Sequence, residues 1–302
     1  MFNPEHLRTL RAVVEEGTVL AAADELGLTP SAVSQQIAKL TETAGQPVLV
    51  RRGRNVVPTD AATVLVRIGI EMQRLDERAR SELERLTHEV AGSLAVSGFA
   101  TSMRSVIALA VGQMRRDHPH LELSLAELDP DVSMERLLRR QVDLAVVHDW
   151  TDQQLVFPEG IHVHLLGEDV VDLVAPADHD LPVRADGTVY LRDLHDRTWI
   201  DENPGVYNDW LVAALREAKV NYRIASTVDT YASKIALAAA GFGLCLVPRL
   251  GRDPFTDEVV FLPVRPRPVR RIFAAYRESS QDRPAVRAML AALDRAWHEV
   301  PT

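Results

Sequence analysis

A segment near the amino terminus carries small polar side chains at helical spacing. The Gln35 amide holds both a donor and an acceptor, so it can make two hydrogen bonds to one edge of a DNA base. Ser31 and Ser34 can reach bases or phosphate, and a helix that begins at Thr29 presents backbone N–H groups that favour a phosphate oxygen. The residues predicted to contact DNA here are Thr29, Pro30, Ser31, Ser34, Gln35 and Lys39.

Basic residues follow directly in the run PVLVRRGRNVVPT. Two short extended stretches flank its centre, which predicts a β-hairpin whose guanidinium groups contact the DNA backbone or enter the minor groove. The arginines predicted to contact DNA are Arg51, Arg52 and Arg54. Residues 29–59 hold four Lys or Arg against Glu42 alone, whereas the whole chain has a net charge of -9. This distribution excludes a protein that coats nucleic acid by bulk charge and favours a local contact.

Three short helices are expected to position these side chains. Asn3 and Pro4 begin the first helix and Gly17 ends it, and an alanine-rich second helix runs from Val19 to Leu26. The third has Thr29 as its cap and continues to Gly45. A helix, a turn with glycine, a second helix with a small polar outer face and a basic hairpin together are typical of a winged helix–turn–helix.

A long helix is predicted from Thr59 and Asp60 onward, over about thirty residues and ending by Gly92. Its apolar residues recur at steps of three and four: Val64, Leu65, Ile68, Met72, Leu75, Ala79, Leu83 and Leu86. A stripe of this length needs a partner, and the same helix of a second copy is the simplest one. Packing of the helix on its own domain is the alternative.

From Leu94 onward, short apolar runs alternate with helical segments, which predicts an α/β domain with a parallel sheet. The predicted strands are LAVSG, LELSLAEL, DLAVV, VVDLVAP, TWI, NYRIASTV, GLCLVP and RRIFAAY. The predicted helices are about 102–116, 132–140, 207–219, 231–240 and 284–299. Two such modules indicate two lobes, with a ligand expected at the carboxyl ends of the strands.

Four blocks carry a resemblance to a known family: AAADELGLTPSAVSQQIAKL, VRRGRNVVPTDAA, LLRRQVDLAVV and AAGFGLCLVPR. In this order they resemble LysR-type transcriptional regulators along the whole chain. The resemblance implies a winged helix–turn–helix, a dimerising coiled-coil linker helix and a two-lobed, periplasmic-binding-protein-like effector domain. It also implies a homo-oligomer, usually a tetramer, that bends promoter DNA in response to a small metabolite and has RNA polymerase as a further partner.

The resemblance sets the expected domain boundaries. These are the DNA-binding domain at 1–58, the linker helix at 59–91 and the effector domain at 92–302, with lobe I at about 92–165 and 267–302 and lobe II at about 166–266. Pro30, Ser31, Ser34 and Gln35 match the recognition-helix contacts of the family, and Arg52 and Arg54 match its wing. Three positions depart from the pattern. Gln35 stands where Arg or Lys is usual, Leu20 where a capping Ser or Thr is frequent, and Ala62 where Gly is common.

Effector contacts are expected at the strand ends of both lobes. Thr101 matches a threonine that follows the first strand in many relatives, and with Ser102 and Arg104 it suits an anion. Thr101 as a plain helix cap is the alternative, and Trp150 is open to the alternative of a lobe-interface residue. The predicted effector-binding residues are Thr101, Ser102, Arg104, His148, Asp149, Trp150, Asn203, Gly205, Asp229 and Thr230.

Other classes of protein find little support in the 302 residues. There is no apolar run of the roughly 18 to 20 residues that a membrane span needs, and the amino terminus lacks a secretion signal, so a cytoplasmic protein is expected. Without a serine in a glycine elbow or a phosphate-cradling glycine loop, we expect no enzyme and no cofactor. The single cysteine, Cys245, is expected to be a packed free thiol.

Two alternatives to a ligand-controlled regulator stay open. His118 with His120 and His162 with His164 could each share a strand face and bind a metal ion, but Pro119 interrupts the first pair and a structural site usually needs four ligands. Packed or surface histidines are therefore favoured, and no metal is expected. The other alternative is an architectural DNA-binding protein whose second half takes no ligand.

Overall fold

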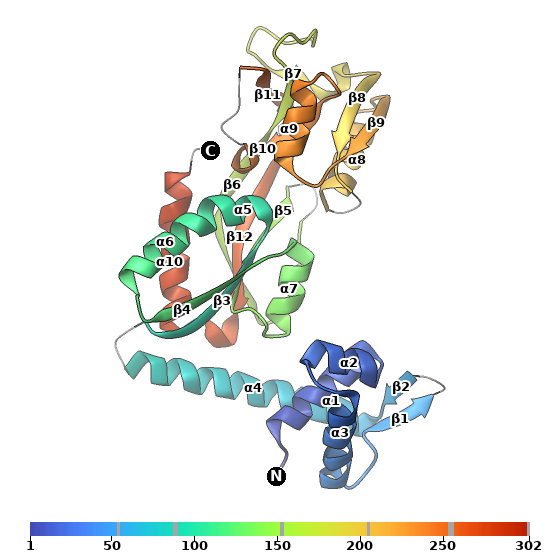
Figure 1. The fold of residues 1–302 in the computed structure, drawn as a ribbon, viewed down its shortest axis with the longest axis vertical. Helices are drawn as coiled ribbons and strands as arrows, with labels where there is room; N and C mark the ends of the chain where they lie inside the picture. The colour runs from blue at the N-terminus through green and yellow to red at the C-terminus, as the bar shows by residue number, and fades with distance from the viewer. Residues whose placement is uncertain (53–54, 87–89, 152–153, 204–205, 253–256, 301–302) are drawn as a thin grey trace. The chain divides into compact units, whose positions relative to one another are not determined.

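The computed structural model describes residues 1–52, 55–86, 90–151, 154–203, 206–252 and 257–300 (Figure 1). The chain divides into two compact units, Met1–Leu83 and Glu84–Thr302. Within the described ranges, no helix combines the length and the apolar composition that a membrane span requires. The predicted boundaries of the three domains and of the two lobes remain predictions.

The amino-terminal unit holds the three predicted helices and the predicted hairpin. The elements are α1 (Pro4–Glu16), α2 (Val19–Leu26), α3 (Pro30–Ala44), β1 (Leu49–Arg52) and β2 (Asn55–Pro58), followed by α4 (Asp60–Leu86). Local capping explains the boundaries, because the side chains of Asn3, Thr18 and Thr29 each accept a backbone N–H in the first turn of a helix. The core is built from all of these elements and includes Leu7, Leu10, Val13, Val33, Leu40, Val48, Ala62 and Leu65.

The helix α4 uses its first half for the domain core. Ala62 and Leu65 are buried there. At Gly69 a Cβ atom, if present, would lie 3.0 Å from the Cβ of Leu7 in α1, so α1 and α4 approach closely at this glycine. Further along, the apolar stripe is exposed: Leu75, Leu83 and Leu86 have exposed fractions of 61%, 64% and 74%. Packing on its own domain therefore accounts for the first half only, and pairing of the second half with another copy stays a prediction.

The second unit contains an eight-stranded sheet. Along it run β4 (Leu121–Glu127), β3 (Gly92–Gly98), β5 (Leu144–Trp150), β12 (Val269–Arg277), β6 (Ile161–Pro176), β11 (Val259–Arg265) and β7 (Val189–Tyr190), while β10 (Cys245–Pro248) also pairs with β6. A smaller sheet joins β8 (Arg197–Asp201) to β9 (Tyr222–Thr227). The α-helices are α5 (Ala100–Ser102), α6 (Ala108–Asp117), α7 (Pro130–Leu138), α8 (Val206–Glu217), α9 (Tyr231–Ala239) and α10 (Pro284–Glu299). A π-helix at Met103–Ile107 joins α5 to α6.

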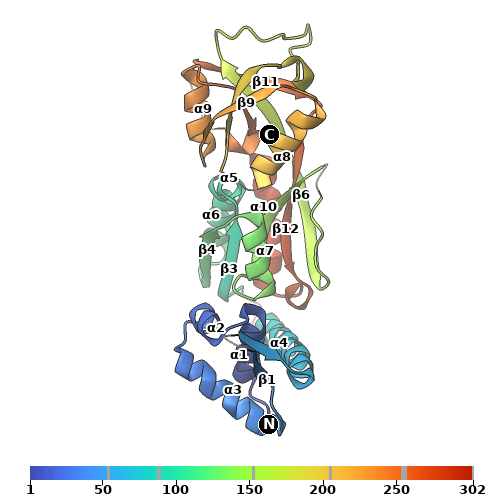
Figure 2. The ribbon, with the colours of Figure 1, turned by 90° about the vertical axis from the view of Figure 1, so that its right-hand side faces the viewer.

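The helices cover both faces of the large sheet, as Figures 1 and 2 show. In β5, Val146 packs under α6 and α10, whereas Ala145 and Val147 pack under α7. In the second half of the unit, α8 and α9 contribute to two separate cores in the same way. This alternation gives an α/β architecture of two lobes, each with its own core.

The prediction of a parallel sheet is wrong for half of the pairings. Strands β3 and β4, β3 and β5, β7 and β11, and β8 and β9 are parallel, but β12 runs antiparallel to β5 and β6, and β10 and β11 run antiparallel to β6. β11 and β12, which are joined by three residues, run in the same direction one after the other along β6. Because this part of the chain returns along β6 in the opposite direction, both strands pair antiparallel with it.

The strand β6 is longer than the apolar run VVDLVAP suggests. It begins at Ile161 and pairs with β12 as far as Val170, then with β10 and β11 to Pro176. Its first half was missed because polar residues alternate with apolar ones there, as expected for a strand with one exposed face. One strand therefore passes through both lobes, and β12 returns beside it.

Cys245 is buried in β10, as predicted, and burial raises the pKa of its thiol to about 12. We expect a thiol reagent such as iodoacetamide to leave the folded protein unmodified at pH 8 and to modify Cys245 completely in urea. Intact mass measured over time checks this, with free glutathione in the same tube as the control. Rapid modification of the folded chain would contradict the buried position.

Candidate DNA-binding and effector-binding sites

The outer face of α3 is exposed along its whole length. The residues predicted for this face, Thr29, Pro30, Ser31, Ser34, Gln35 and Lys39, are all exposed. The two adjacent glutamine side chains differ in their surroundings: Gln35 is exposed, whereas Gln36 accepts a hydrogen bond from Thr9 of α1. Ser34 donates to the Pro30 carbonyl at 2.8 Å, so its hydroxyl is held close to the helix.

The basic hairpin is held against the helices. Val56 N donates to the Gly17 carbonyl at 3.3 Å, and Thr59 Oγ1 donates to the Pro47 carbonyl at 2.9 Å. Arg52, opposite Asn55 in the register, is exposed. Arg54 and the side chain of Arg51 lie outside the described residues.

Two positions that depart from the family pattern lie at the starts of helices. Thr18 caps α2, with Oγ1 accepting the Ala21 N–H at 3.1 Å, so Leu20 is free to be exposed. Ala62 is fully buried at the start of α4, and its N–H donates to Thr59 Oγ1 at 3.3 Å. A capping hydroxyl is therefore present at the start of each of these helices.

In lobe I, the predicted anion-binding residues are engaged within the protein. Thr101 and Ser102 are buried, and Ser102 Oγ donates to the Phe99 carbonyl at 2.7 Å. Thr101 Oγ1 accepts from Arg270 Nη2 at 2.6 Å. The alternative of Thr101 as the helix cap is wrong, because Phe99 occupies that position. Arg104 Nη2 donates to the Gly251 carbonyl at 2.9 Å and thus joins α5 and its π-helix to the turn after β10.

The pair Arg270 and Asp169 lies at the centre of these contacts. Both side chains are buried, with Arg270 Nε donating to Asp169 Oδ2 at 2.8 Å. The other carboxylate oxygen of Asp169 accepts the Leu250 N–H at 3.1 Å, and the Arg270 guanidinium lies 4.9 Å from the centre of the Phe99 ring. The sequence analysis missed this pair. The available signal was a charged residue at the edge of each apolar run, Asp169 directly before VVDLVAP and Arg270 at the start of RRIFAAY, because a charge next to a buried strand needs a partner.

The three residues that end β5 have separate roles. Asp149 is buried and accepts two hydrogen bonds from Arg271, at 2.9 and 2.5 Å. Trp150 is buried and stacks on Trp210 of α8, with ring centres 3.9 Å apart and planes 6° apart. The indole thus packs in the lobe II core, and a contact of Trp150 with the effector stays a prediction.

His148 packs edge-on to Phe99, with ring centres 4.6 Å apart, and its Nδ1 has no hydrogen-bond partner among the described residues. Burial, together with the nearby Arg270 charge, lowers the pKa of His148 well below its ordinary value. The imidazole is therefore neutral at pH 7.

In lobe II, three predicted residues come together at an exposed rim. Asn203 Nδ2 donates to Asp229 Oδ1 at 2.6 Å, and Thr230 caps α9 by accepting the Ser233 N–H. Gly205 lies outside the described residues. Next to this rim the sequence analysis missed a second ion pair, between the buried Lys234 and the half-buried Glu202.

Lys234 Nζ lies 2.7 Å from Glu202 Oε1 and 3.3 Å from the centre of the Tyr207 ring, with Tyr231 on another side at 4.8 Å. Burial lowers the pKa of Lys234 and raises that of Glu202, and each charge is maintained by the other. Two buried cations, Arg270 and Lys234, thus lie near the boundary of the lobes, where the Arg270 charge acts on both His148 and Glu202.

Neither histidine pair forms a metal site in the described part of the chain, where no three metal-ligating side chains cluster. His164 pairs with Asp294 at 2.7 Å, and His162 packs against the Tyr276 ring. The absence of a metal remains a prediction.

Comparison with known proteins agrees with this architecture. Residues 4–63 match the family model of the lysR family of bacterial regulatory helix-turn-helix proteins, and residues 87–297 match that of the LysR substrate binding domain. The transcriptional activator IlvY of Salmonella typhimurium is 26% identical over 262 residues, covering 85% of this chain and 87% of IlvY. The probable transcriptional regulator LrrA of Synechococcus elongatus is 28% identical over 316 residues, covering 99% of this chain and 98% of LrrA.

Among solved structures, a full-length OxyR variant from Pseudomonas aeruginosa has the same fold, with a TM-score of 0.68 at 18% identity, over 97% of this chain and 95% of that chain. The chain belongs to the LysR family, because the substrate-binding model alone covers more than two thirds of its residues. It is thus a DNA-binding transcriptional regulator that carries an effector-binding domain. The family and fold class predicted from the sequence are confirmed.

The buried neutral state of His148 predicts a pH dependence of stability. Because the folded-state pKa is lowered, the unfolded chain takes up the proton first, so stability is lost as the pH falls below about 6.5. We expect the melting temperature to fall less between pH 7.5 and 5.5 in His148→Gln than in the wild type. Thermal unfolding at both values, with His195→Gln as the control for an exposed histidine, checks this. An equal fall in all three proteins would show that His148 does not contribute.

The central ion pair predicts a large loss of stability on removal of one partner. Arg270→Met leaves the Asp169 carboxylate buried without its main partner and should destabilise the second unit by about 3 to 5 kcal/mol. The double variant Arg270→Met with Asp169→Asn should regain part of this loss. Urea unfolding followed by tryptophan fluorescence measures both, with the exposed Arg287→Met as a control. If Arg270→Met is as stable as Arg287→Met, the ion pair does not stabilise the second unit.

Proposed function

We propose that the outer face of α3 enters the major groove of promoter DNA and that Gln35 reads a base edge there. The observation that carries this is the arrangement of α3: Val33 and Leu40 anchor its inner face in the core, and the polar side chains remain exposed on a fixed helix. A glutamine amide makes its paired hydrogen bonds best with adenine, whereas the arginine or lysine more usual in this family favours guanine. Arg52 supplies a charged contact to phosphate from the hairpin.

We also propose a small anion as the effector, bound where the two lobes meet. Support comes from the buried guanidinium of Arg270, the buried ammonium of Lys234 and the unpartnered His148 Nδ1. A carboxylate with a hydrogen-bond donor would match two cations and a neutral imidazole. The predicted rim residues Asn203, Asp229 and Thr230 are the lobe II candidates for contacting the rest of the ligand.

The same contacts suggest how ligand binding changes the protein. An anion between the lobes competes with the bonds from Arg270 to Thr101 and from Arg104 to the Gly251 carbonyl, and so shifts the balance between more closed and more open lobes. In a dimer joined through the exposed half of α4, or in the tetramer that we expect, this change alters the spacing of the recognition helices and the DNA bend. The regulator acts through binding and not as an enzyme. Because it acts on bacterial promoters, we place it in the cytoplasm.

Variants of the DNA-binding surface test the docking. Arg52→Ala should weaken binding to specific and random DNA alike and reduce the salt slope by about one unit, since one phosphate contact is lost. Gln35→Ala should mainly reduce discrimination between sequences, by about 1 to 3 kcal/mol. Fluorescence anisotropy on DNA from upstream of the gene, on a scrambled duplex and across a salt series measures both effects.

The exposed Arg8→Ala on α1 serves as the matched control for loss of positive charge within the same domain. If Arg52→Ala and Gln35→Ala both bind the two duplexes as Arg8→Ala does, α3 and the hairpin do not dock as proposed.

A rise in melting temperature with a library of carboxylates separates a ligand-controlled regulator from an architectural protein, because only a ligand that binds the folded state stabilises it.

A further inference from the structure

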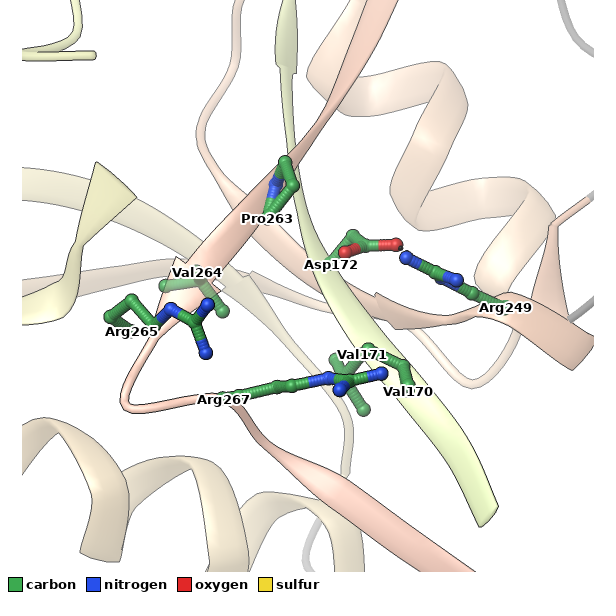
Figure 3. Close-up of a pocket in the computed structure, with 8 residues that line it drawn as sticks. All are labelled: Val170, Val171, Asp172, Arg249, Pro263, Val264, Arg265 and Arg267. Atoms are coloured by element: carbon green, nitrogen blue, oxygen red, sulfur yellow. Dashed lines mark hydrogen bonds and ion pairs between the residues drawn. The ribbon is translucent and has the colours of Figure 1, made fainter. Parts of the chain in front are cut away.

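A second cationic site lies where the chain passes between the two lobes. A cavity of about 160 Å³ is lined by Val170, Val171, Asp172, Arg249, Pro263, Val264, Arg265 and Arg267 (Figure 3). Three arginines and one aspartate are thus among the lining residues, and the aspartate points toward Arg249. This volume is below the roughly 300 to 1,000 Å³ of pockets for drug-sized ligands, so the cavity fits only a small molecule.

The arginines at this cavity differ in whether an acidic side chain pairs with them. Arg249 Nε donates to Asp172 Oδ2 at 3.0 Å, and Arg252 donates to the same oxygen. Within the described residues, no hydrogen bond or ion pair holds the Arg267 side chain, and Arg265 has only a longer-range interaction with the exposed Asp186. The carboxylate of Asp172 is thus already shared, and the cavity has spare positive charge.

The sequence of this connection explains why the charge accumulates. Residues 265–271 contain four arginines and no acidic residue. Arg270 and Arg271 are neutralised by buried aspartates, Asp169 and Asp149, whereas Arg265 and Arg267 are exposed and have no such partner among the described residues. Although the whole chain has a net charge of -9, Arg265 and Arg267 together with Arg249 therefore give this cavity a local excess of positive charge.

The backbone holds these arginines in place. Pro266 and Pro268 restrict the three-residue connection between β11 and β12, and the Pro268 carbonyl accepts the Val171 N–H at 3.0 Å. Figure 3 shows Arg267 extending across β6 toward Val170, with Arg249 beyond β6. The backbone positions of Arg265 and Arg267 are thus set before an oxyanion binds, so binding orders the side chains alone.

We propose that this cavity is a binding site for a small oxyanion, a phosphate or carboxylate group, held by Arg265 and Arg267 with Arg249. The site is distinct from the effector region that surrounds Arg270 and Lys234, because its lining residues belong to neither cation's contacts. Its occupant contacts β6 and the β11–β12 connection, the two segments that pass between the lobes, and so stabilises one relative arrangement of those segments.

Isothermal titration of the full-length protein tests the site. Sodium phosphate and sodium succinate are titrated separately at pH 7.5 into wild type, into Arg265→Gln with Arg267→Gln, and into a control with the same charge change, Arg216→Gln with Arg287→Gln. Both control arginines are exposed and belong to α8 and α10. Sodium chloride at equal ionic strength measures the general salt effect. Phosphate that binds to α3 or to the hairpin contributes equally in all three proteins.

We expect wild type and control to bind at least one of the two anions with equal affinity, and the Arg265 and Arg267 variant to bind it at least about tenfold more weakly, since two charge-assisted hydrogen bonds are lost. Preference for phosphate or for succinate identifies the source of the oxyanion. The proposal is overturned if neither anion binds, or if the double variant binds as tightly as the control.

Discussion

The ion pair of Arg270 with Asp169 is the interaction on which the arrangement of the effector domain depends. Removing two charges from water costs several kcal/mol for each ion, and the cost is offset only where the geometry is good and the remaining donors and acceptors are satisfied. Here Asp169 receives the Leu250 N–H as well as the guanidinium, and Arg270 also reaches Thr101. Strands β6 and β12, the turn after β10 and the start of α5 must therefore all be in place for the pair to be stable.

Aromatic packing also connects the two lobes. Trp150 belongs to the end of β5 in lobe I, yet its ring stacks on Trp210 in the lobe II core. A stacked pair of this kind contributes about 0.5 to 1.5 kcal/mol beyond the area it buries. Any change in lobe closure must therefore carry the end of β5 along with α8 or break the stack.

The sequence alone predicted what depends on local interactions. Caps such as Asn3 and Thr29 and the stop at Gly17 define helix ends within a few residues, and the structure has those helices where they were expected. Strand direction depends instead on which distant segment lies alongside, so alternation of strands and helices gave a parallel sheet where β12 is antiparallel. The effector residues were harder still. Thr101 was found by its motif, but its partner Arg270 is 169 residues away.

The placement of positive charge explains how an acidic chain can bind anions. At physiological ionic strength the Debye length is about 8 Å, so carboxylates elsewhere on the surface do little to the field at α3 or at the β11–β12 connection. What matters is the local count. At α3 the exposed Lys39 and the exposed polar residues lie on a helix fixed by Val33 and Leu40. At the connection, buried aspartates fix Arg270 and Arg271 and leave Arg265 and Arg267 unpaired among the described residues. In both places a rigid backbone presents charge that the protein itself does not neutralise, and this combination favours binding of an outside anion over collapse onto a surface carboxylate.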